Sequence, residues 1–461
     1  MATGHGALAA DLRRVAPGAQ VLDAPQDRTL YAYDGTSTKA LPDAIVMARS
    51  ARDAAAVLRF AAQRAIPVVP RGAGTGLSGG SVPAQGGIAL VLAGMRAIRE
   101  LDQGSMMAVV EPGVVTGPFQ KAAEEAGMFY PPDPASLNYC TLGGNVAENA
   151  GGPHGVKYGV TKDYVLGLEV ALPNGDVVKL GGKQIKNVTG YNLVQLFVGS
   201  EGTLGVITEI VLRLLPRPPA KKTMLAIFDR LDDAAEAVAG IMAGGVIPAT
   251  LEIMDQRSIH CVEDYLRLGL PRDAEAILLI EVDGMPPAVE AEADVIARIC
   301  RERSVRTFQA ARTAKEADDL WRARRAISPA ISQARPSKIG EDISVPRSAV
   351  PAMVRQIQRI SREYSLPIVI FGHAGDGNLH PNILTDRRDP VEMERVEHAI
   401  HAIFEASVRL GGTLSGEHGI GTTKRPFLRM ALSPEAVALM QSVKRAVDPA
   451  GILNPGKIFE A

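Results

Sequence analysis

Residues 67 to 80 read Pro67-Val68-Val69-Pro70-Arg71-Gly72-Ala73-Gly74-Thr75-Gly76-Leu77-Ser78-Gly79-Gly80, a short apolar strand that runs into a glycine-rich loop. Glycine has no Cβ and accepts positive φ, so backbone N–H groups in such a loop can come close to a bulky anion. Arg71 adds a fixed positive charge that suits phosphate. We therefore interpret the loop as a diphosphate site, with a glycine-rich turn that binds nothing as the alternative.

The loop also matches the G-x-G-x-x-G pattern of Rossmann folds at residues 74 to 79. In those folds a helix begins directly after the glycines, and its N-terminus carries the pyrophosphate. Here the chain continues through Pro83, Gly86 and Gly87 into the strand-like segment Ile88–Leu92, which leaves no room for a helix. We expect the loop to lie between two strands, in a different class of nucleotide site.

The chain has 461 residues, of which 46% are apolar, and this length predicts two or three domains. The formal net charge is −1 and no long run of one sign occurs, so nothing indicates nucleic-acid binding. Asp11, Arg13 and Arg14 interrupt the N-terminal apolar residues, and no apolar stretch reaches the ~18 residues of a membrane-spanning helix. We expect a cytoplasmic protein, or one attached peripherally to the inner membrane.

The three cysteines, Cys140, Cys261 and Cys300, stand alone in the sequence. They form no C-x-x-C pair of the kind that holds zinc or an iron–sulfur cluster. Any electrons that pass through this protein must therefore leave it by another route.

Before the prolines at 216, 218 and 219, helical and strand-like segments are interspersed, which predicts an α+β domain that ends there. Predicted helices cover 7–16, 52–64 and 117–126, and predicted strands cover 88–92, 107–111 and 165–172. A second polar and glycine-rich stretch runs over 130–152, and with the first it indicates one extended ligand held at both ends. A third, at 197–208, is a predicted turn into a strand that ends near Leu215.

From Lys221 onward the pattern is strand, helix, strand, which predicts an antiparallel sheet with helices on one face, in ferredoxin-like order. A basic helix is predicted over 314–333. Most of its charges are expected on a solvated face. Arg324 is the exception, because Trp321 and Ser328 share its side of that helix.

Residues 371 to 382 read Phe371-Gly372-His373-Ala374-Gly375-Asp376-Gly377-Asn378-Leu379-His380-Pro381-Asn382. The glycines and Asp-Gly predict a tight reversal, so His373 and His380 can face each other across a hairpin, with Asn382 on the face of His380. A carboxylate for a metal site is available at Glu417, beside His418, in another glycine-flanked loop. Such a ligand set suits Zn²⁺, with Mn²⁺ and Fe²⁺ as alternatives, although two histidines at this spacing can also be incidental.

Six motifs in this order resemble the vanillyl-alcohol-oxidase superfamily of FAD enzymes, in the branch of the glycolate oxidase FAD subunit, D-lactate dehydrogenases and D-2-hydroxyglutarate dehydrogenase. The motifs are residues 70–80, 132–136 with 141–152, 199–208, 372–382, 415–421 and the tail Leu453-Asn454-Pro455-Gly456-Lys457. The resemblance extends from about Tyr33 to Phe459, which is nearly the whole chain.

The resemblance implies an α+β fold with a two-part FAD-binding domain over residues 1–217 and an antiparallel-sheet substrate (cap) domain with the metal site over 218–425. A C-terminal segment, 426–461, completes the FAD domain. The first glycine loop holds the FAD pyrophosphate, and the second and third line the adenosine and isoalloxazine. The implied FAD-binding residues are Pro70, Arg71, Gly72, Ala73, Gly74, Thr75, Gly76, Leu77, Ser78, Pro132, Asp133, Ser136, Thr141, Gly143, Gly144, Asn145, Asn149, Gly152, Glu201, Gly205, Val206, Ile207 and Asn454.

In the metal-dependent members of that family, the residues matching His373, His380 and Glu417 bind the ion, and the residue matching His418 is the catalytic base. Arg324 matches the arginine that binds the substrate carboxylate, and Asn382 matches a substrate contact. The resemblance thus implies a dehydrogenase that oxidises a D-2-hydroxy acid, of the lactate, glycolate or 2-hydroxyglutarate type, to the 2-keto acid. The ion acidifies the hydroxyl, His418 takes its proton, and the Cα hydride passes to the flavin.

Two departures from the family pattern bear on this expectation. Some relatives attach flavin covalently to a histidine of the first loop, whereas this loop has none, so we expect non-covalent FAD. The family's substrate lysine stands two residues before the Asp of Asp-x-Ser-x-Pro, where this chain has Gly340, and Lys338 is close but shifted.

Three alternatives remain open: an oxidase of the same fold that passes electrons to O₂, a metal hydrolase that uses the His–His–Glu set, and an FAD subunit that needs a partner, as in a multi-subunit glycolate oxidase. The expected electron acceptor is a quinone, a cytochrome, an electron-transfer flavoprotein or an iron–sulfur subunit. The expected assembly is a homodimer or a heteromeric complex.

Overall fold

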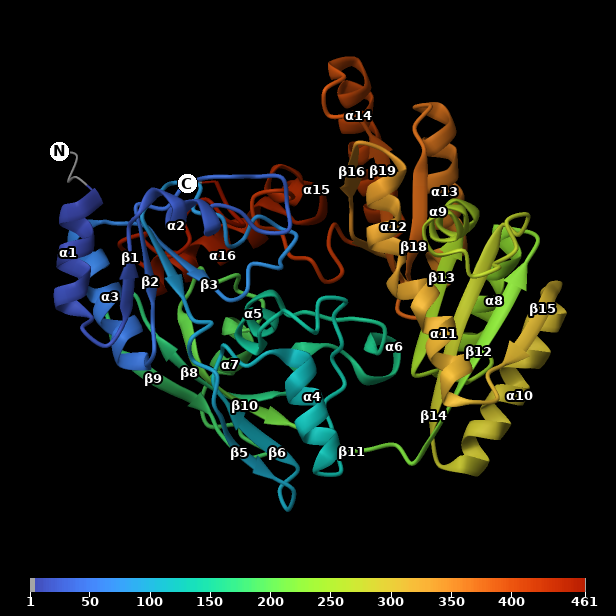
Figure 1. Cartoon of the computed structure of the whole chain (residues 1–461), viewed down its shortest axis with the longest axis horizontal. Helices are drawn as coiled ribbons and strands as arrows, with labels where there is room; N and C mark the ends of the chain where they lie inside the picture. The colour runs from blue at the N-terminus through green and yellow to red at the C-terminus, as the bar shows by residue number, and fades with distance from the viewer. Residues whose placement is uncertain (1–4, 461) are drawn as a thin grey trace. The chain divides into compact units, whose positions relative to one another are not determined.

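The computed structural model describes residues 5–460, which form two compact units. The first unit contains the chain up to Gly151, Val160–Arg217 and the segment from Glu417 to the C-terminal end. The second contains Gly152–Gly159 and Pro218–Gly416. Figure 1 labels most of the helices and strands of both units.

A four-stranded sheet in the first unit carries the glycine loop. Its order is β1 (Gln20–Leu22), β2 (Ala44–Met47), β4 (Ile88–Val91) and β3 (Val68–Arg71), and the last three strands are parallel. Helix α3 (Ala51–Arg64) makes the crossover from β2 to β3, with its N-terminus capped by the Ser50 side chain. Helices α1 (His5–Val15) and α2 (Pro25–Leu30) precede it. The glycine loop runs from β3 to β4 without a helix, as predicted from the sequence.

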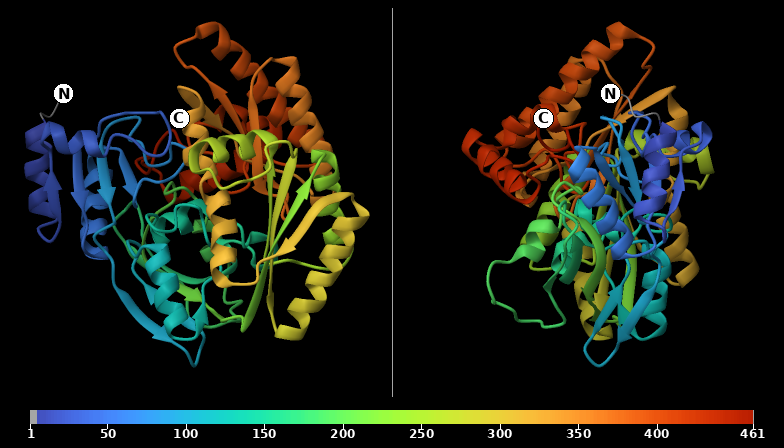
Figure 2. Two further views of the ribbon diagram at one scale, coloured as in Figure 1. Left: turned by 45° about the vertical axis from the view of Figure 1, so that its right-hand side comes forward. Right: turned by 90° about the vertical axis from the view of Figure 1, so that its left-hand side faces the viewer.

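The second sheet of the first unit is antiparallel, in the order β5 (Ile98–Asp102), β6 (Met107–Val110), β10 (Val206–Arg213), β8 (Val165–Ala171) and β9 (Val177–Gly181). Its connections contain the helices α4 (Thr116–Glu125), α5 (Leu142–Glu148) and α7 (Leu193–Phe197), and the pair β7 (Met128–Phe129) and β11 (Leu215–Pro216) lies apart. The connection from β9 to α7 is the green loop that stands away from this sheet in the right-hand view of Figure 2.

The predicted elements of this unit agree well with the structure. The helices expected at 7–16, 52–64 and 117–126 are α1, α3 and α4, and the strands expected at 88–92, 107–111 and 165–172 are β4, β6 and β8. Each lies within two residues of its predicted range at either end.

The C-terminal segment returns to the strand that carries the glycine loop. After α15 (Leu428–Ala431) and α16 (Pro434–Val447), the N–H of Val68 donates to the carbonyl of Ile452 at 2.8 Å, and the N–H of Asn454 donates to the carbonyl of Val68 at 2.8 Å. The Asn454 side chain also donates to the carbonyl of Gly80 at 2.8 Å. The backbone of residues 452–454 therefore lies beside the edge strand β3 of this sheet.

The second unit is built on one antiparallel sheet. Its order is β15 (Val305–Ala310), β12 (Ala220–Phe228), β14 (Ala276–Gly284), β13 (Thr250–Asp255), β18 (Ile368–His373), β19 (Asn378–Thr385) and β16 (Ser337–Gly340), and β17 (Ile343–Ser344) also pairs with β19. The first four strands follow the predicted ferredoxin-like order.

Helices cover both faces of this sheet, so the expectation of helices on one face is wrong. Every position of β13, β18 and β19 is buried, which requires cover on each side. Helices α9 (Gln256–Leu266), α11 (Ala314–Arg325) and α12 (Ile327–Ala334) share one apolar cluster with the sheet. The remaining helices, α8 (Leu231–Ala243), α10 (Pro286–Glu302), α13 (Val350–Glu363) and α14 (Pro390–Arg409), contact the strands without joining that cluster.

The single helix expected over 314–333 is two helices in the structure, since α11 ends at Arg325 and α12 begins at Ile327. Arg324 and Ser328 therefore do not share one continuous helix face. Among residues 5–460, no helix combines the length and the apolar character that a membrane crossing requires.

Candidate active site

The first unit contains a cavity of about 230 Å³ at the end of the glycine strand. It lies where segments far apart in the sequence meet. The lining includes the predicted residues Pro70, Arg71, Gly72, Ala73, Gly74, Thr75, Gly76, Leu77, Ser136, Thr141, Gly143, Gly144, Asn145, Glu201, Gly205, Val206 and Ile207, together with Glu417 and His418.

The glycines of this cavity fit a large ligand that approaches the backbone. Gly74 has φ of +72°, and a Cβ there would lie only 2.5 Å from Cζ of the Arg71 guanidinium. At Gly76 a Cβ would meet nothing nearer than Oε1 of Glu148 at 3.9 Å, so the space above that residue is open cavity. The open space beside Gly76 and the guanidinium of Arg71 beside Gly74 suit a dinucleotide diphosphate such as that of FAD.

Six predicted FAD-binding residues do not line this cavity: Ser78, Pro132, Asp133, Asn149, Gly152 and Asn454. Gly152 belongs to the second unit. Asn454 supports the cavity indirectly, because its side chain donates to the carbonyls of Gly80 and Glu201, and both of these residues line the cavity.

Residues 142–148, part of the second glycine-rich stretch, form the helix α5 rather than a loop. Glycine is a poor helix former, so its frequency argued against a helix. The ends compensate: the Thr141 side chain accepts the N–H of Gly144, and Asn149 ends the helix in the left-handed conformation.

Glu201 holds the loop that carries His418. Its carboxylate accepts the backbone N–H groups of Ile420 and Gly421, each at 2.7 Å. It stands at φ +51°, a conformation that few non-glycine residues adopt. The backbone of the same loop also bonds the glycine loop, where the N–H of Thr422 donates to the carbonyl of Ser78 at 2.9 Å. The position of His418 in the first unit is thus set by two of the glycine-rich motifs.

In the second unit, His373 and His380 face each other across the hairpin of β18 and β19, as predicted. Their ring centroids are 5.0 Å apart at an interplanar angle of 87°, and both side chains are buried. Gly372, with φ of +153°, allows the close approach, because a Cβ there would lie 2.5 Å from the carbonyl oxygen of Asn378. The local turn chemistry therefore places both imidazoles on one face of the sheet.

Sequence reasoning missed Glu252, on the neighbouring strand β13. This fully buried carboxylate accepts from Nε of Arg324 at 2.6 Å and lies 2.7 Å from Nδ1 of His373. Desolvation acts to raise its pKa, but the charges of Arg324 and His373 outweigh it, and the pKa of Glu252 is lowered. One carboxylate thus joins the predicted substrate-binding arginine to a predicted metal ligand.

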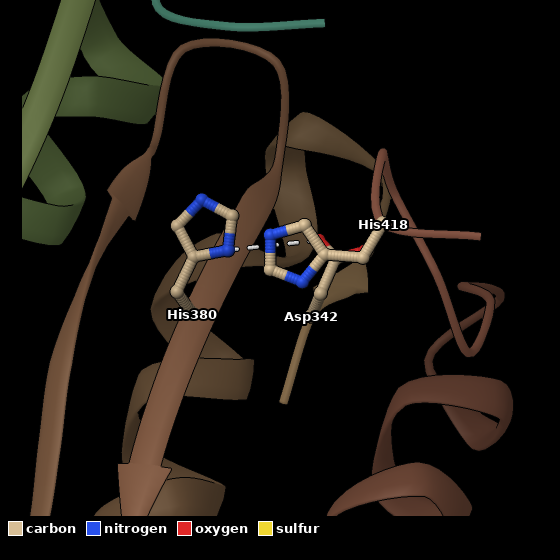
Figure 3. A group of neighbouring side chains, drawn as sticks. All are labelled: Asp342, His380 and His418. Carbon is tan, nitrogen blue, oxygen red and sulfur yellow. Dashed lines mark ion pairs between the residues drawn. The ribbon is translucent and has the colours of Figure 1, made fainter. Parts of the chain in front are cut away.

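Asp342 was also missed, although it begins a motif named from the sequence. Its Oδ1 lies 3.6 Å from Nδ1 of His380, as Figure 3 shows, and accepts from the side chain of Asn378 at 2.6 Å. Its Oδ2 accepts from the hydroxyl of Ser415 at 2.7 Å and the N–H of Gly416 at 2.9 Å. Asp342 therefore links His380 to the loop that contains Ser415 and Gly416.

Gly340, which stands where the family has its substrate lysine, and Lys338 both lie in strand β16. Gly340 pairs with Asn382 across β16 and β19, and a Cβ at Gly340 would lie 2.7 Å from Oδ1 of that asparagine. Lys338 instead donates to the hydroxyl and carbonyl of Ser328, at 2.9 and 3.1 Å. Burial lowers the pKa of Lys338.

The structure divides the expected site residues between its units. His373, His380, Arg324 and Asn382 belong to the second unit, and Glu417 and His418 belong to the first. The expected ligand set of His373, His380 and Glu417 therefore stays a prediction.

Two domain families match the sequence. Residues 42–181 match the FAD binding domain, and residues 217–458 match the C-terminal domain of FAD linked oxidases. The glycolate oxidase subunit GlcD of Bacillus subtilis (strain 168) is 47% identical over 95% of this chain and 93% of its own length. The D-lactate dehydrogenase of Anaerostipes hadrus is 36% identical over 91% of this chain and 90% of its own length.

A solved structure with the same fold is p-cresol methylhydroxylase with substrate bound. It aligns with a TM-score of 0.82 over 99% of this chain and 97% of that chain. At 19% identity this similarity describes the fold alone. The predicted architecture, an FAD-binding domain with an antiparallel-sheet domain, is confirmed.

Proposed function

The chain belongs to the FAD-linked oxidases, and we propose that it is a dehydrogenase that oxidises a D-2-hydroxy acid of the lactate, glycolate or 2-hydroxyglutarate type to the 2-keto acid. The observation that carries the proposal is the cavity that the glycine loop shares with His418. An imidazole beside the cofactor cradle is suited to take the proton of a substrate hydroxyl. The names of the glycolate oxidase and D-lactate dehydrogenase relatives support the substrate class.

Bound FAD would supply the two-electron chemistry by accepting the substrate hydride. The chain's own residues then have separate tasks. Arg324 presents its guanidinium to the substrate carboxylate, and Glu252 keeps that guanidinium in one orientation through the Nε contact. Asn382 contacts the substrate beside the two histidines. A ring nitrogen of His418 accepts the hydroxyl proton.

We include in the proposal a divalent ion, Zn²⁺ or in its place Mn²⁺ or Fe²⁺, held by His373, His380 and Glu417. The contact of His373 Nδ1 with Glu252 leaves Nε2 as the ligand atom, a pattern common among metal-binding histidines. Glu417 directly follows Gly416, which is bonded to Asp342. An ion there would supply Lewis-acid chemistry toward the hydroxyl.

The division into an FAD-binding domain (1–217), a substrate domain (218–425) and a completing segment (426–461) belongs to the same proposal. So do the electron acceptor, which would be a quinone, a cytochrome, an electron-transfer flavoprotein or an iron–sulfur subunit, and a cytoplasmic or peripheral inner-membrane location. The word subunit in the name of the Bacillus subtilis relative favours a heteromeric complex.

Two variants separate the metal ligand from the base. Glu417→Gln should lose metal and make flavin reduction depend on added Zn²⁺ or Mn²⁺. His418→Asn should keep metal and FAD but slow flavin reduction by about 10²-fold or more, the scale of a positioned acid–base group. His398→Asn, on the exposed part of α14, is the matched control. Loss of metal in His418→Asn with retention in Glu417→Gln would overturn the assignment.

Anaerobic bleaching of the flavin against D- and L-2-hydroxy acids tests the reaction itself. Acid denaturation should release the yellow cofactor into solution, because the first loop offers no histidine for a covalent bond. Peroxide formed under air would favour an oxidase, and purified protein without flavin would favour the hydrolase. Bound FAD that no hydroxy acid bleaches would indicate an FAD subunit that needs its partner.

A further inference from the structure

Glu148 ends helix α5 and lines the cavity of the first unit, and neither the resemblance nor the proposed reaction assigns it a role. Its Oε2 is covered from solvent and has no hydrogen-bond partner among the described residues. Its Oε1 lies 2.9 Å from the position that a Cβ would take at Gly80 and 3.9 Å from that at Gly76. An enclosed oxygen without a hydrogen-bond partner makes the ionised carboxylate costly, and Oε1 is the oxygen that lies near the cavity-lining residues Gly76 and Gly80.

The surroundings of Glu148 oppose a negative charge. Desolvation, followed by the nearby carboxylates of Glu201 and Asp34, raises the pKa of Glu148 well above its ordinary value, and the Ser78 side chain lowers it only in part. The C-terminal end of a helix also disfavours an anion. No lysine or arginine is among the groups that lower the pKa of Glu148.

The neighbouring carboxylate, Glu201, has a different electrostatic environment. Desolvation raises the pKa of Glu201 as well, but two backbone N–H groups and the charges of Lys424 and Lys457 stabilise its carboxylate. Asp34 accepts the N–H and the hydroxyl of Thr36 at its Oδ1, at 2.9 and 2.7 Å. Of the two glutamates, Glu148 is the one whose environment better suits a neutral acid.

We propose that Glu148 keeps its proton in the folded protein and donates it in a hydrogen bond to an acceptor atom of FAD. This inference rests on the proposed function only in that FAD fills the cavity. The carboxyl group lies close to Gly76 and Gly80 of the glycine loop and to Gly419, one residue after His418. It therefore reaches the cofactor between its diphosphate and the place of the reaction. A neutral acid donates where a carboxylate would repel an electron-rich ring.

The direct test is infrared difference spectroscopy of the holoenzyme at pH 7. A carbonyl stretch of a protonated carboxylic acid should be present in the wild type, shift when FAD is removed, and vanish in Glu148→Gln. Glu209→Gln, which alters a carboxylate of the same unit in its ion pair with Arg99, is the control and should keep the band. A wild type without this band, or a band unchanged in Glu148→Gln, overturns the proposal.

The variants also separate hydrogen bonding from shape. Glu148→Gln keeps a donor and should bind FAD within about twofold of wild type, whereas Glu148→Leu should bind at least about tenfold more weakly, the scale of one buried hydrogen bond. The flavin midpoint potential should change in the leucine variant and not in the glutamine variant. Equal behaviour of the two variants would contradict the proposal. A wild type that binds no FAD would contradict the proposed function instead.

Discussion

At the scale of single residues, Glu252 joins two residues of the candidate site in the second unit. It is fully buried, and it pairs at once with Arg324, whose side chain is 11% exposed, and with His373. A buried charge is tolerated only when it is paired, so the Arg324 guanidinium would be costly without the carboxylate. Glu252 thus supports the fold and orients two residues of the candidate site.

We predict that Glu252→Gln destabilises the protein by about 3 kcal/mol or more, because it leaves the Arg324 guanidinium buried without a counter-charge. Urea unfolding monitored by Trp321 fluorescence measures the change. Asp319→Asn, which breaks the exposed pair with Lys315, should hardly alter stability. Similar urea midpoints for the two variants would show that the buried pair stabilises the protein no more than the exposed pair.

The same pair predicts a pH dependence. The pKa of Glu252 is lower in the folded protein than in the unfolded chain, so its stabilising contribution is complete above the unfolded value of about 4.3. That contribution is lost as the pH falls from there through the folded value. The stability difference between wild type and Glu252→Gln should therefore shrink in acid, measured by unfolding midpoints from pH 7 to pH 3. A difference that is constant over this range would argue against the ion pair.

At the scale of elements, the glycine loop between β3 and β4 makes the cofactor cradle. Gly76→Val places two methyl groups in open cavity, where the nearest atom to a Cβ is 3.9 Å away. We predict folded protein with strongly reduced FAD content, measured by absorbance after acid release. Gly104→Val, in the exposed turn between β5 and β6, should keep full FAD content. Full flavin occupancy in Gly76→Val would mean that the ligand contacts another part of the loop.

The sequence predicts local elements better than distant pairings, and the two histidines show why. A reversal is encoded within a few residues by glycines and Asp-Gly, so the facing of His373 and His380 could be predicted. Glu252 lies 121 residues before His373 and joins it only because β13 and β18 become neighbours. No local pattern encodes that pairing, although an acidic residue at a position buried on both sides is a signal in retrospect.

Helix α5 was missed because a local signal, its glycine content, was misleading. Its glycines disfavour a helix by propensity, while its capping residues and the packing of buried Leu142 and Val146 favour it. The helix in turn places Glu148 at the cavity, so an error in one element concealed a candidate functional residue.

At the scale of the whole molecule, the chain closes its first unit with its last residues. Leu453 pairs with Val68 in β3, and the buried Asn454 side chain joins the carbonyls of Gly80 and Glu201, at 2.8 and 2.7 Å. The buried amine of Lys457 donates to the carbonyl of Val82 at 2.7 Å, and burial lowers the pKa of that lysine to about 8. The end of the chain therefore supports the glycine loop that begins near residue 70.

This closure predicts separate responses of the two units to truncation. A chain that ends at Val447 loses the contacts to Val68, Gly80 and Val82, so the first unit should lose FAD and melt at lower temperature. Trp321, the single tryptophan of the chain, lies in the second unit and packs against an apolar cluster whose described members all come from residues 225–384. The fluorescence of Trp321 should therefore keep the native spectrum at 25 °C.

The substitution Asn454→Ala tests the same segment with a smaller change. It should lower the stability of the first unit by about 1–3 kcal/mol, since two buried carbonyls lose their donor. Wild-type FAD content in the truncated chain, or loss of the native Trp321 spectrum together with FAD, would show that the terminal segment does not act on the first unit alone.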